Sequence, residues 1–357
     1  MTQQLPSPIS IVAVSRAGSA LAQRIAAALP GARALLPARF AAADSCAYEG
    51  GVLAAVAAEF EWARGLVLIM ASGIAVRAVA PLLRDKREDP AVVVVDDAGR
   101  FVISLVGGHL GGANTLATRI AGAIGAVPVI TTASEAAGLP ALDMIASERG
   151  WRVDAGSDLT RVSAALVNGE PMAVLQDRGS RDWLAAAGAA RLRTIANASE
   201  TGSDDAAAIV ISCRSEVALP PTLLRVIMRP PVLMLGAGCS RGAPPEELIG
   251  LAEAVLDEAG LAPACVAAVA TIDRRCDDPA MAALAARFAV PTLSFSSAEL
   301  NAAPGDWQRS AIVLSAVGAG GVCEPAAILA ARGGALIVSK RKSAHATIAV
   351  AHLTEDG

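Results

Sequence analysis

Apolar runs of strand length alternate with amphipathic helical patterns along the first third of the chain. Residues 9–15 (ISIVAVS) predict a buried strand, and residues 19–29 predict a helix that ends before Pro30-Gly31. Residues 65–71 predict another buried strand, followed by a helix from about Ile74 to Leu83. This alternation is typical of a largely parallel sheet with helices on both faces.

Residues 91–106 (AVVVVDDAGRFVISLV) interrupt that alternation. Two β-branched runs flank the sequence DDAG at 96–99, which is the composition of a hairpin turn. Residues 106–117 (VGGHLGGANTLA) follow, with four glycines around one of the three histidines of the chain. A helix through Ile124 and a strand at 126–133 come next, so this glycine-rich loop is expected to follow a strand and to begin a helix.

The pattern weakens between about residues 140 and 228 and then resumes. The middle region predicts a helix near 142–149, strands at 171–176 and 206–212, and an exit marked by the proline pairs 220–221 and 230–231. The last region predicts strands at 231–240, 266–272, 291–296 and 311–317, helices at 244–259, 278–289 and 324–331, and two final apolar runs. We therefore expect two α/β units with mainly parallel sheets, joined by a small α+β middle domain, with domains at 1–140, 141–228 and 229–357.

Length and composition agree with this division, because 357 residues exceed the roughly 250–300 at which a single core stops growing. The net charge of −4, without a long basic run, argues against a nucleic-acid partner. The best candidate for a membrane span, residues 65–83, contains Arg77, a Ser72-Gly73 break and Pro81, so we expect no membrane association. The first residues show no basic stretch followed by an apolar run, so we expect no signal peptide, and the six cysteines show no CxxC spacing. We therefore expect a cytoplasmic protein with reduced thiols.

Four glycine-rich stretches are candidates for ligand binding: 71–77, 107–114, 235–244 and 317–325. Glycine turns between a strand and a helix expose backbone N–H groups that bind anions. None of the four fits a dinucleotide fingerprint or a P-loop. His109 is a candidate general acid or base, and the alternative is a residue that makes only local hydrogen bonds.

Two further features leave a functional and a structural interpretation open. Glu324, at or just before a helix start, either interacts with the helix dipole or serves as a carboxylate base. The cations at 340–342 form either a solvated turn or a site for ligand carboxylates. A second cationic group (Arg77, Arg84, Lys86 and Arg87) lies near another glycine turn, and together the two groups suggest an anionic ligand.

Residues 65–121 closely resemble the N-terminal domain of the cobalt-precorrin-5A hydrolases of cobalamin biosynthesis. LGAGCSRGAPPEEL (235–248), VGAGGVCEPAAILAA (317–331) and KRKSAHATIAVA (340–351) resemble the C-terminal domain of that family. The resemblance covers nearly the whole chain, although the middle region contributes little to it. It implies a hydrolase that opens the δ-lactone of a cobalt corrinoid precursor and releases acetaldehyde.

The resemblance also implies roles for the candidate residues in one reaction. We expect His109 or Glu324 to act as the base, and backbone N–H groups of the glycine loop, helped by Asn114, to stabilise an oxyanion. Cations are expected to hold the peripheral carboxylates of the substrate. The full set of expected substrate-binding residues is Gly73, Arg77, Lys86, Gly107, Gly108, Gly111, Gly112, Asn114, Gly236, Gly238, Arg241, Gly318, Lys340 and Thr347.

The cobalt is expected to arrive with the tetrapyrrole substrate, so neither a separate metal site nor another cofactor is expected. Neighbouring methyltransferases of the pathway are candidate partners, and a homodimer is left open. The C-terminal domain also resembles a smaller protein of the aerobic route, which makes a non-catalytic corrinoid-binding or carrier protein the alternative function. The complete N-terminal domain favours the hydrolase.

Overall fold

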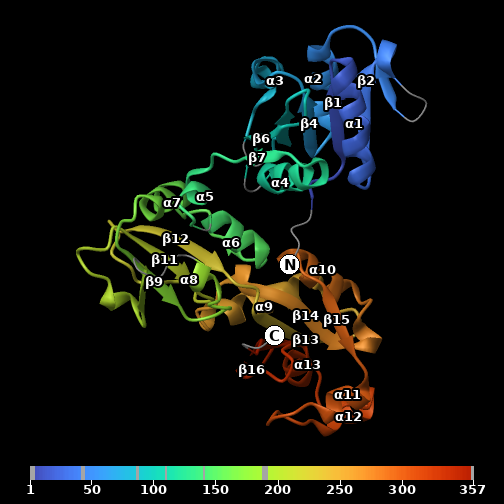
Figure 1. The fold of residues 1–357 in the computed structure, drawn as a ribbon. Helices are drawn as coiled ribbons and strands as arrows, with labels where there is room; N and C mark the ends of the chain where they lie inside the picture. Colours follow the sequence, from blue (N-terminus) through green and yellow to red (C-terminus); the bar gives the residue numbers. More distant parts are fainter. Residues whose placement is uncertain are drawn as a thin grey trace. The chain divides into compact units, whose positions relative to one another are not determined.

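The computed structural model describes residues 5–41, 45–85, 88–108, 111–139, 141–186 and 192–354. The chain divides into two compact units, Met1–Met144 and Ile145–Gly357. The second unit contains two separate sheets, which belong to the middle and C-terminal regions (Figure 1). The mixed α/β architecture with mostly parallel sheets confirms the predicted fold class.

The first unit contains a seven-stranded sheet, which crosses from one edge to the other in the order β3 (Cys46–Tyr48), β2 (Ala32–Pro37), β1 (Ile9–Ala13), β4 (Gly65–Ile69), β5 (Ala91–Val95), β6 (Phe101–Val106) and β7 (Val127–Val129). Its helices are α1 (Arg16–Ala28), α2 (Val52–Trp62), α3 (Ser72–Val79), α4 (Ala113–Ile124) and α5 (Ala133–Ala136), with single turns η1 (Ala38–Phe40) and η2 (Ala80–Leu82). The predicted hairpin is confirmed, because β5 and β6 pair antiparallel.

Alternating residues of the central strands face opposite layers of helices. Val67 and Ile69 of β4 pack with α1 and α4, whereas Leu66 and Leu68 pack with α2 and α3. All four side chains are fully buried. Continuous apolar strands therefore mark a sheet that is covered on both faces, as the sequence pattern indicates.

The middle region is more regular than its weak sequence pattern suggests. Its sheet has the order β10 (Leu192–Ile195), β9 (Met172–Gln176), β11 (Ala207–Ile211), β12 (Leu224–Arg229) and β8 (Arg152–Val153). The first four strands are parallel, and the two-residue strand β8 is antiparallel to β12. The helical segments are α6 (Leu142–Glu148), α7 (Leu159–Val167), α8 (Trp183–Ala186) and η4 (Ala198–Glu200). The segment between the proline pairs is thus the core strand β12.

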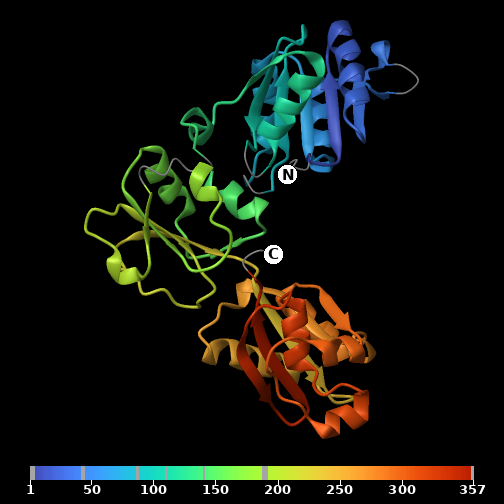
Figure 2. The same ribbon diagram turned by 60° about the horizontal axis from the view of Figure 1, so that its bottom comes forward.

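The C-terminal sheet has the order β15 (Thr292–Phe295), β14 (Val266–Ile272), β13 (Leu233–Cys239), β17 (Ala346–His352) and β16 (Leu336–Lys342). Its helical segments are α9 (Pro245–Glu258), α10 (Pro279–Phe288), α11 (Ser297–Ala302), α12 (Ala311–Val317), α13 (Cys323–Ala330), η5 (Pro263–Cys265) and η6 (Asp273–Arg275). Helices α9 and α10 cover one face, and α11 and α13 cover the other. Figure 2 shows β16 and β17, in red, along one side of this sheet.

The apolar run at 311–317 is a helix, so the predicted strand is wrong. Ser310 caps the start of α12 by accepting a hydrogen bond from the Val313 N–H, and Gly318 ends the helix with a φ of +76°. A short apolar run does not by itself distinguish a strand from a helix, and here the capping residues decide. Ile312 is 80% exposed, although the helix consists almost entirely of apolar residues.

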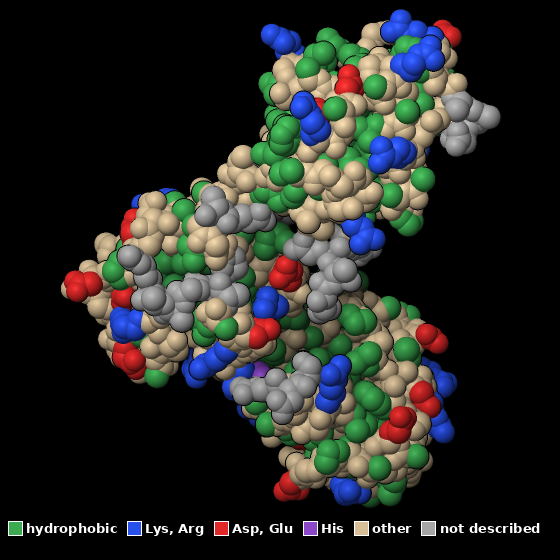
Figure 3. All heavy atoms as spheres, viewed as in Figure 1, with side chains coloured by type: hydrophobic (Ala, Val, Ile, Leu, Met, Phe, Trp, Pro, Cys, Tyr) green, Lys and Arg blue, Asp and Glu red, His purple; other side chains and the backbone are tan. Residues whose placement is uncertain are grey.

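The protein surface carries no continuous basic face in the view of Figure 3. Lys and Arg side chains lie dispersed there among apolar and acidic ones. Among the described residues, no helix combines the length and the apolar character that crossing a membrane requires.

Candidate functional site

The glycine loop of the first unit closes on itself. The Ala113 N–H donates to the Gly107 carbonyl at 3.0 Å, and the Asn114 N–H donates to the Gly108 carbonyl at 3.0 Å. Gly107 has a φ of +72°, and a Cβ on Gly111 would lie 2.7 Å from the Gly107 carbonyl oxygen. Gly107 and Gly111 are therefore required for this close approach of the backbone. The two hydrogen bonds also satisfy two N–H groups at the start of α4.

Asn114, whose amide is expected to bind the ligand, is 6% exposed and makes contacts within the fold. Its Oδ1 accepts a hydrogen bond from the Ser104 hydroxyl at 2.7 Å, and its Nδ2 donates to the Thr132 hydroxyl at 3.3 Å. Because Ser104 lies on β6 and Thr132 follows β7, the amide joins both strands to α4. The side-chain amide of Asn114 therefore has hydrogen-bond partners within the fold.

The other candidates of the first unit do not gather at the glycine loop. Gly73 and the exposed Arg77 lie on α3, which follows β4, and the Arg77 guanidinium donates to the Gly73 carbonyl at 3.2 Å. Because β6 runs antiparallel to its neighbour β5, Gly107 and Gly108 lie at the end of the sheet where β4 and β5 begin, whereas α3 starts at the end where β4 finishes. His109 and Lys86 lie outside the described residues.

Gly236 and Gly238 lie inside β13, within the strand predicted at 231–240, and the glycine turn follows this strand at Gly242, which has a φ of +75°. A Cβ on Gly236 would lie 1.8 Å from the Cys323 carbonyl oxygen, and one on Gly238 would lie 2.8 Å from the Thr347 hydroxyl oxygen. Gly236 thus lets α13 approach the sheet closely, and Gly238 leaves room for the Thr347 side chain on the neighbouring strand β17. Gly112 starts α4 and Gly318 ends α12, each with a positive φ, so those two do occupy turns.

Lys340, Arg341 and Lys342 belong to β16, so of the two interpretations left open the solvated turn is wrong for these residues. The turn lies at residues 343–345, and Lys342 pairs with Thr347 across the hairpin. Lys340 is half-buried, whereas Arg341 and Lys342 are exposed. The strand therefore brings the cations to the edge of the sheet where β13 and β14 end.

Glu324 lies in the first turn of α13, as expected, and is 2% exposed. One carboxylate oxygen accepts the Gln308 backbone N–H at 2.8 Å, and the other accepts the Lys340 backbone N–H at 2.9 Å. The side chain therefore joins the loop before α12 to strand β16. Backbone donors thus satisfy both oxygens of this buried carboxylate.

A pocket of about 600 Å³ lies at the carboxyl ends of β13 and β14, where ligands bind in α/β sheets. It brings together the three C-terminal motifs that the sequence singles out. Its wall consists of Gly238, Cys239, Ser240 and Arg241 after β13, Ile272 and Arg275 after β14, Gln308, Ser310, Ile312, Val313, Ala316 and Val317 around α12, Gly321–Pro325 at the start of α13, and Lys340 and Lys342–Thr347 from the hairpin.

Five of the candidate residues line this pocket: Gly238, Arg241, Glu324, Lys340 and Thr347. Gly236 and Gly318 are not part of its wall. Sequence reasoning missed Arg275 and the apolar wall from α12. The position of Arg275, directly after a predicted strand, was a signal that could have identified it.

The pocket combines apolar and cationic walls. Within the described part of the chain, the side chains of Arg241, Lys340 and Lys342 have no hydrogen bond or ion pair, whereas Arg275 pairs with Asp278 at 3.2 Å. Helix α12 supplies aliphatic side chains, including Ile312 and Val313. Such a surface suits a large, flat apolar molecule with carboxylates at its periphery.

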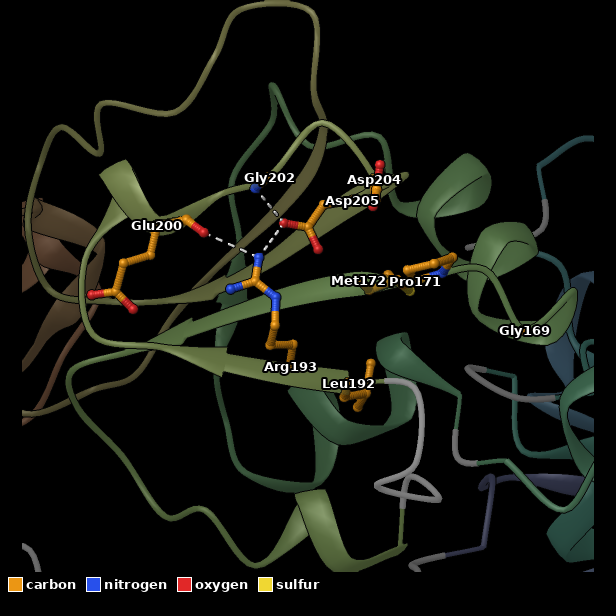
Figure 4. A pocket seen from close by; sticks show the side chains of 9 residues that line it. All are labelled: Gly169, Pro171, Met172, Leu192, Arg193, Glu200, Gly202, Asp204 and Asp205. Carbon is orange, nitrogen blue, oxygen red and sulfur yellow. Dashed lines mark hydrogen bonds and ion pairs between the residues drawn. The ribbon is translucent and has the colours of Figure 1, made fainter.

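A second hollow, of about 880 Å³, lies in the middle region (Figure 4). Its central Arg193 pairs with the buried Asp205 and donates to the Glu200 carbonyl at 3.1 Å. The Asp205 carboxylate also accepts the Gly202 N–H at 2.8 Å. These contacts hold the loop before β11 against β10, so the charged groups that meet at Arg193 are already paired.

The cysteines differ in exposure, which gives a testable difference in reactivity. Burial raises the pKa of the Cys323 thiol to about 11, and burial also raises the pKa of Cys265. Because the thiolate is the reactive form, both thiols should resist iodoacetamide in the folded protein at pH 8. The exposed Cys46 should be alkylated first. Mass spectrometry of native and urea-unfolded samples checks this, and equal native labelling of Cys323 and Cys46 would contradict it.

Comparison with known families gives three matches along the chain. The family models described as cobalamin synthesis G N-terminal, cobalamin biosynthesis central region and cobalamin synthesis G C-terminus match residues 54–135, 140–230 and 233–351.

Two curated relatives carry the same name. A cobalt-precorrin-5A hydrolase from Priestia megaterium is 36% identical over 316 residues, covering 87% of this chain and 84% of that protein. A cobalt-precorrin-5A hydrolase from Salmonella typhimurium is 31% identical over 350 residues, covering 97% of this chain and 99% of that protein. The protein CobE from Sinorhizobium sp is 46% identical over 121 residues, covering 33% of this chain and 79% of CobE.

Proposed function

The chain belongs to the cobalt-precorrin-5A hydrolase family of cobalamin biosynthesis, and on that basis we propose that it hydrolyses cobalt-precorrin-5A. In the proposed reaction, water opens the δ-lactone to a carboxylate and an alcohol. The alcohol then loses a proton, its carbon–carbon bond to the macrocycle breaks, and acetaldehyde leaves to give cobalt-precorrin-5B. The cobalt is carried by the substrate throughout.

The convergence of three C-terminal motifs on one pocket is the observation that most supports this proposal. Arg241, Lys340 and Lys342 are suited to bind acetate and propionate side chains, because charge-assisted hydrogen bonds to carboxylates are strong. Ile312 and Val313 on α12 offer an apolar contact for the macrocycle. We propose that this pocket holds part of the tetrapyrrole.

We propose His109 or Glu324 as the base that activates water, with backbone N–H groups of the glycine loop as oxyanion donors. The two hydrogen bonds that Glu324 accepts favour a positioning role for that carboxylate. His109→Ala should then reduce turnover at least 100-fold, the lower range of general acid–base contributions. Near-normal turnover of this variant would exclude His109.

The test of the proposed function uses the purified full-length chain with cobalt-precorrin-5A and a reagent that traps acetaldehyde. We expect aldehyde release that depends on the protein and exceeds one equivalent per chain. Tight binding of the substrate without aldehyde would overturn the proposal and support a corrinoid carrier instead.

A further inference from the structure

The turn between β16 and β17 forms part of the pocket wall and is held by a carboxylate from another element. Glu247, in the first turn of α9, accepts hydrogen bonds from the Ser343 hydroxyl and, at 2.8 Å, from the His345 backbone N–H. One carboxylate thus holds the first and the last residue of the turn.

A second set of contacts ties the same turn to the end of β13. The Ser240 N–H donates to the His345 carbonyl at 2.9 Å, and within the hairpin the Ser343 N–H donates to the Ala346 carbonyl at 2.9 Å. Ser240, Ser343 and His345 all line the pocket. The shape of this wall therefore depends on contacts from α9 and β13 as well as on the hairpin itself.

The electrostatic environment keeps Glu247 charged. The Ser343 hydroxyl and the His345 backbone N–H donate to the carboxylate and hold the pKa of Glu247 below its usual range. The start of a helix also favours a negative charge. Its neighbour Glu246 is equally close to the start of α9 but is exposed, and it makes none of these contacts with the turn.

We propose that Glu247 is a positioning residue for the substrate pocket, because its carboxylate holds the 343–345 turn in the shape that presents Lys342 and His345 to a carboxylate of the ligand. Binding to a preformed wall avoids the cost of ordering the turn, which otherwise reduces affinity. Glu247 itself points to the turn and takes no part in bond making. The identity of the ligand as a tetrapyrrole polycarboxylate rests on the proposed function.

The test compares Glu247→Ala and Glu247→Gln with Glu246→Ala, which removes the same charge one residue away. We expect Glu247→Ala to raise KM for cobalt-precorrin-5A roughly tenfold and to leave kcat within about twofold of the wild type. The substitution should weaken substrate binding without changing the chemical step. Glu247→Gln should lie between it and the wild type, because an amide oxygen still accepts hydrogen bonds. Glu246→Ala should behave as the wild type.

Two further measurements separate this inference from the proposed function. Hydrogen exchange of the amides at 343–347 should accelerate in Glu247→Ala and stay unchanged in Glu246→Ala. Absorbance titration with cobyrinic acid, a stable corrinoid polycarboxylate, should show about tenfold weaker binding for Glu247→Ala, with or without turnover by the wild type. Unchanged exchange, unchanged affinity, or a fall in kcat at constant KM would overturn the role of Glu247.

Discussion

Gly236→Ala is expected to lower the free energy of unfolding of the C-terminal domain by about 3 kcal/mol or more. The new Cβ would lie 1.8 Å from the Cys323 carbonyl oxygen and 2.8 Å from the Ala327 nitrogen, and both atoms belong to the backbone of α13. A backbone cannot rotate away as a flexible side chain can, so the whole helix has to move. That movement would also displace Glu324 and the pocket wall that starts α13.

Gly250→Ala provides the matched control for this substitution. Gly250 is exposed on α9, and an added Cβ would meet no atom within 4 Å. Alanine is the better helix former, so this variant should gain roughly 0.5–1 kcal/mol. Urea unfolding, followed by hydrogen exchange of β13 and α13, measures both effects. Equal stability of the two variants would contradict the close packing of α13 on β13.

The double substitution Arg241→Gln with Lys340→Gln is expected to raise KM for cobalt-precorrin-5A roughly 100-fold. Each hydrogen bond to a charged group contributes about 1.5–3 kcal/mol, and each 1.4 kcal/mol corresponds to about tenfold in affinity. The fold should survive, because Arg241 is exposed and Lys340 contacts Glu324 through its backbone N–H, which glutamine retains.

Arg274→Gln is the control for charge, since Arg274 is exposed near the end of β14 but does not line the pocket. Its KM should stay within about twofold of the wild type. Added salt should raise KM of the wild type more than that of the double variant, because screening weakens only the interactions that are present. An unchanged KM in the double variant would show that the pocket does not bind the substrate.

Elements with a strong local signal were predictable from the sequence. Strand β14 occupies the predicted 266–272, and the hairpin at 91–106 forms around its DDAG turn at 96–99. Helix α4 begins after the glycine loop, as expected. In each case the apolar period and the turn chemistry lie within a few residues of one another.

Elements whose role depends on a distant partner were not predictable in this way. Gly236 lies in a predicted strand, but the contact that requires glycine there is with α13, which lies almost ninety residues later in the sequence. Asn114 appeared free to bind a ligand until Ser104 and Thr132 were placed beside it. The candidate residues Arg241, Glu324 and Lys340 were found individually, whereas their common pocket follows from the pairing of β13, β16 and β17.

The most direct measurement of the proposed hydrolysis is a single-turnover reaction in water enriched in oxygen-18, with acetaldehyde and corrinoid product quantified in the same sample. We expect one acetaldehyde for each substrate consumed and one oxygen-18 atom in the new carboxylate of the corrinoid, because water attacks the lactone carbonyl. Recovery of bound but unchanged substrate, with neither aldehyde nor label, would contradict the assignment of this chain as a hydrolase.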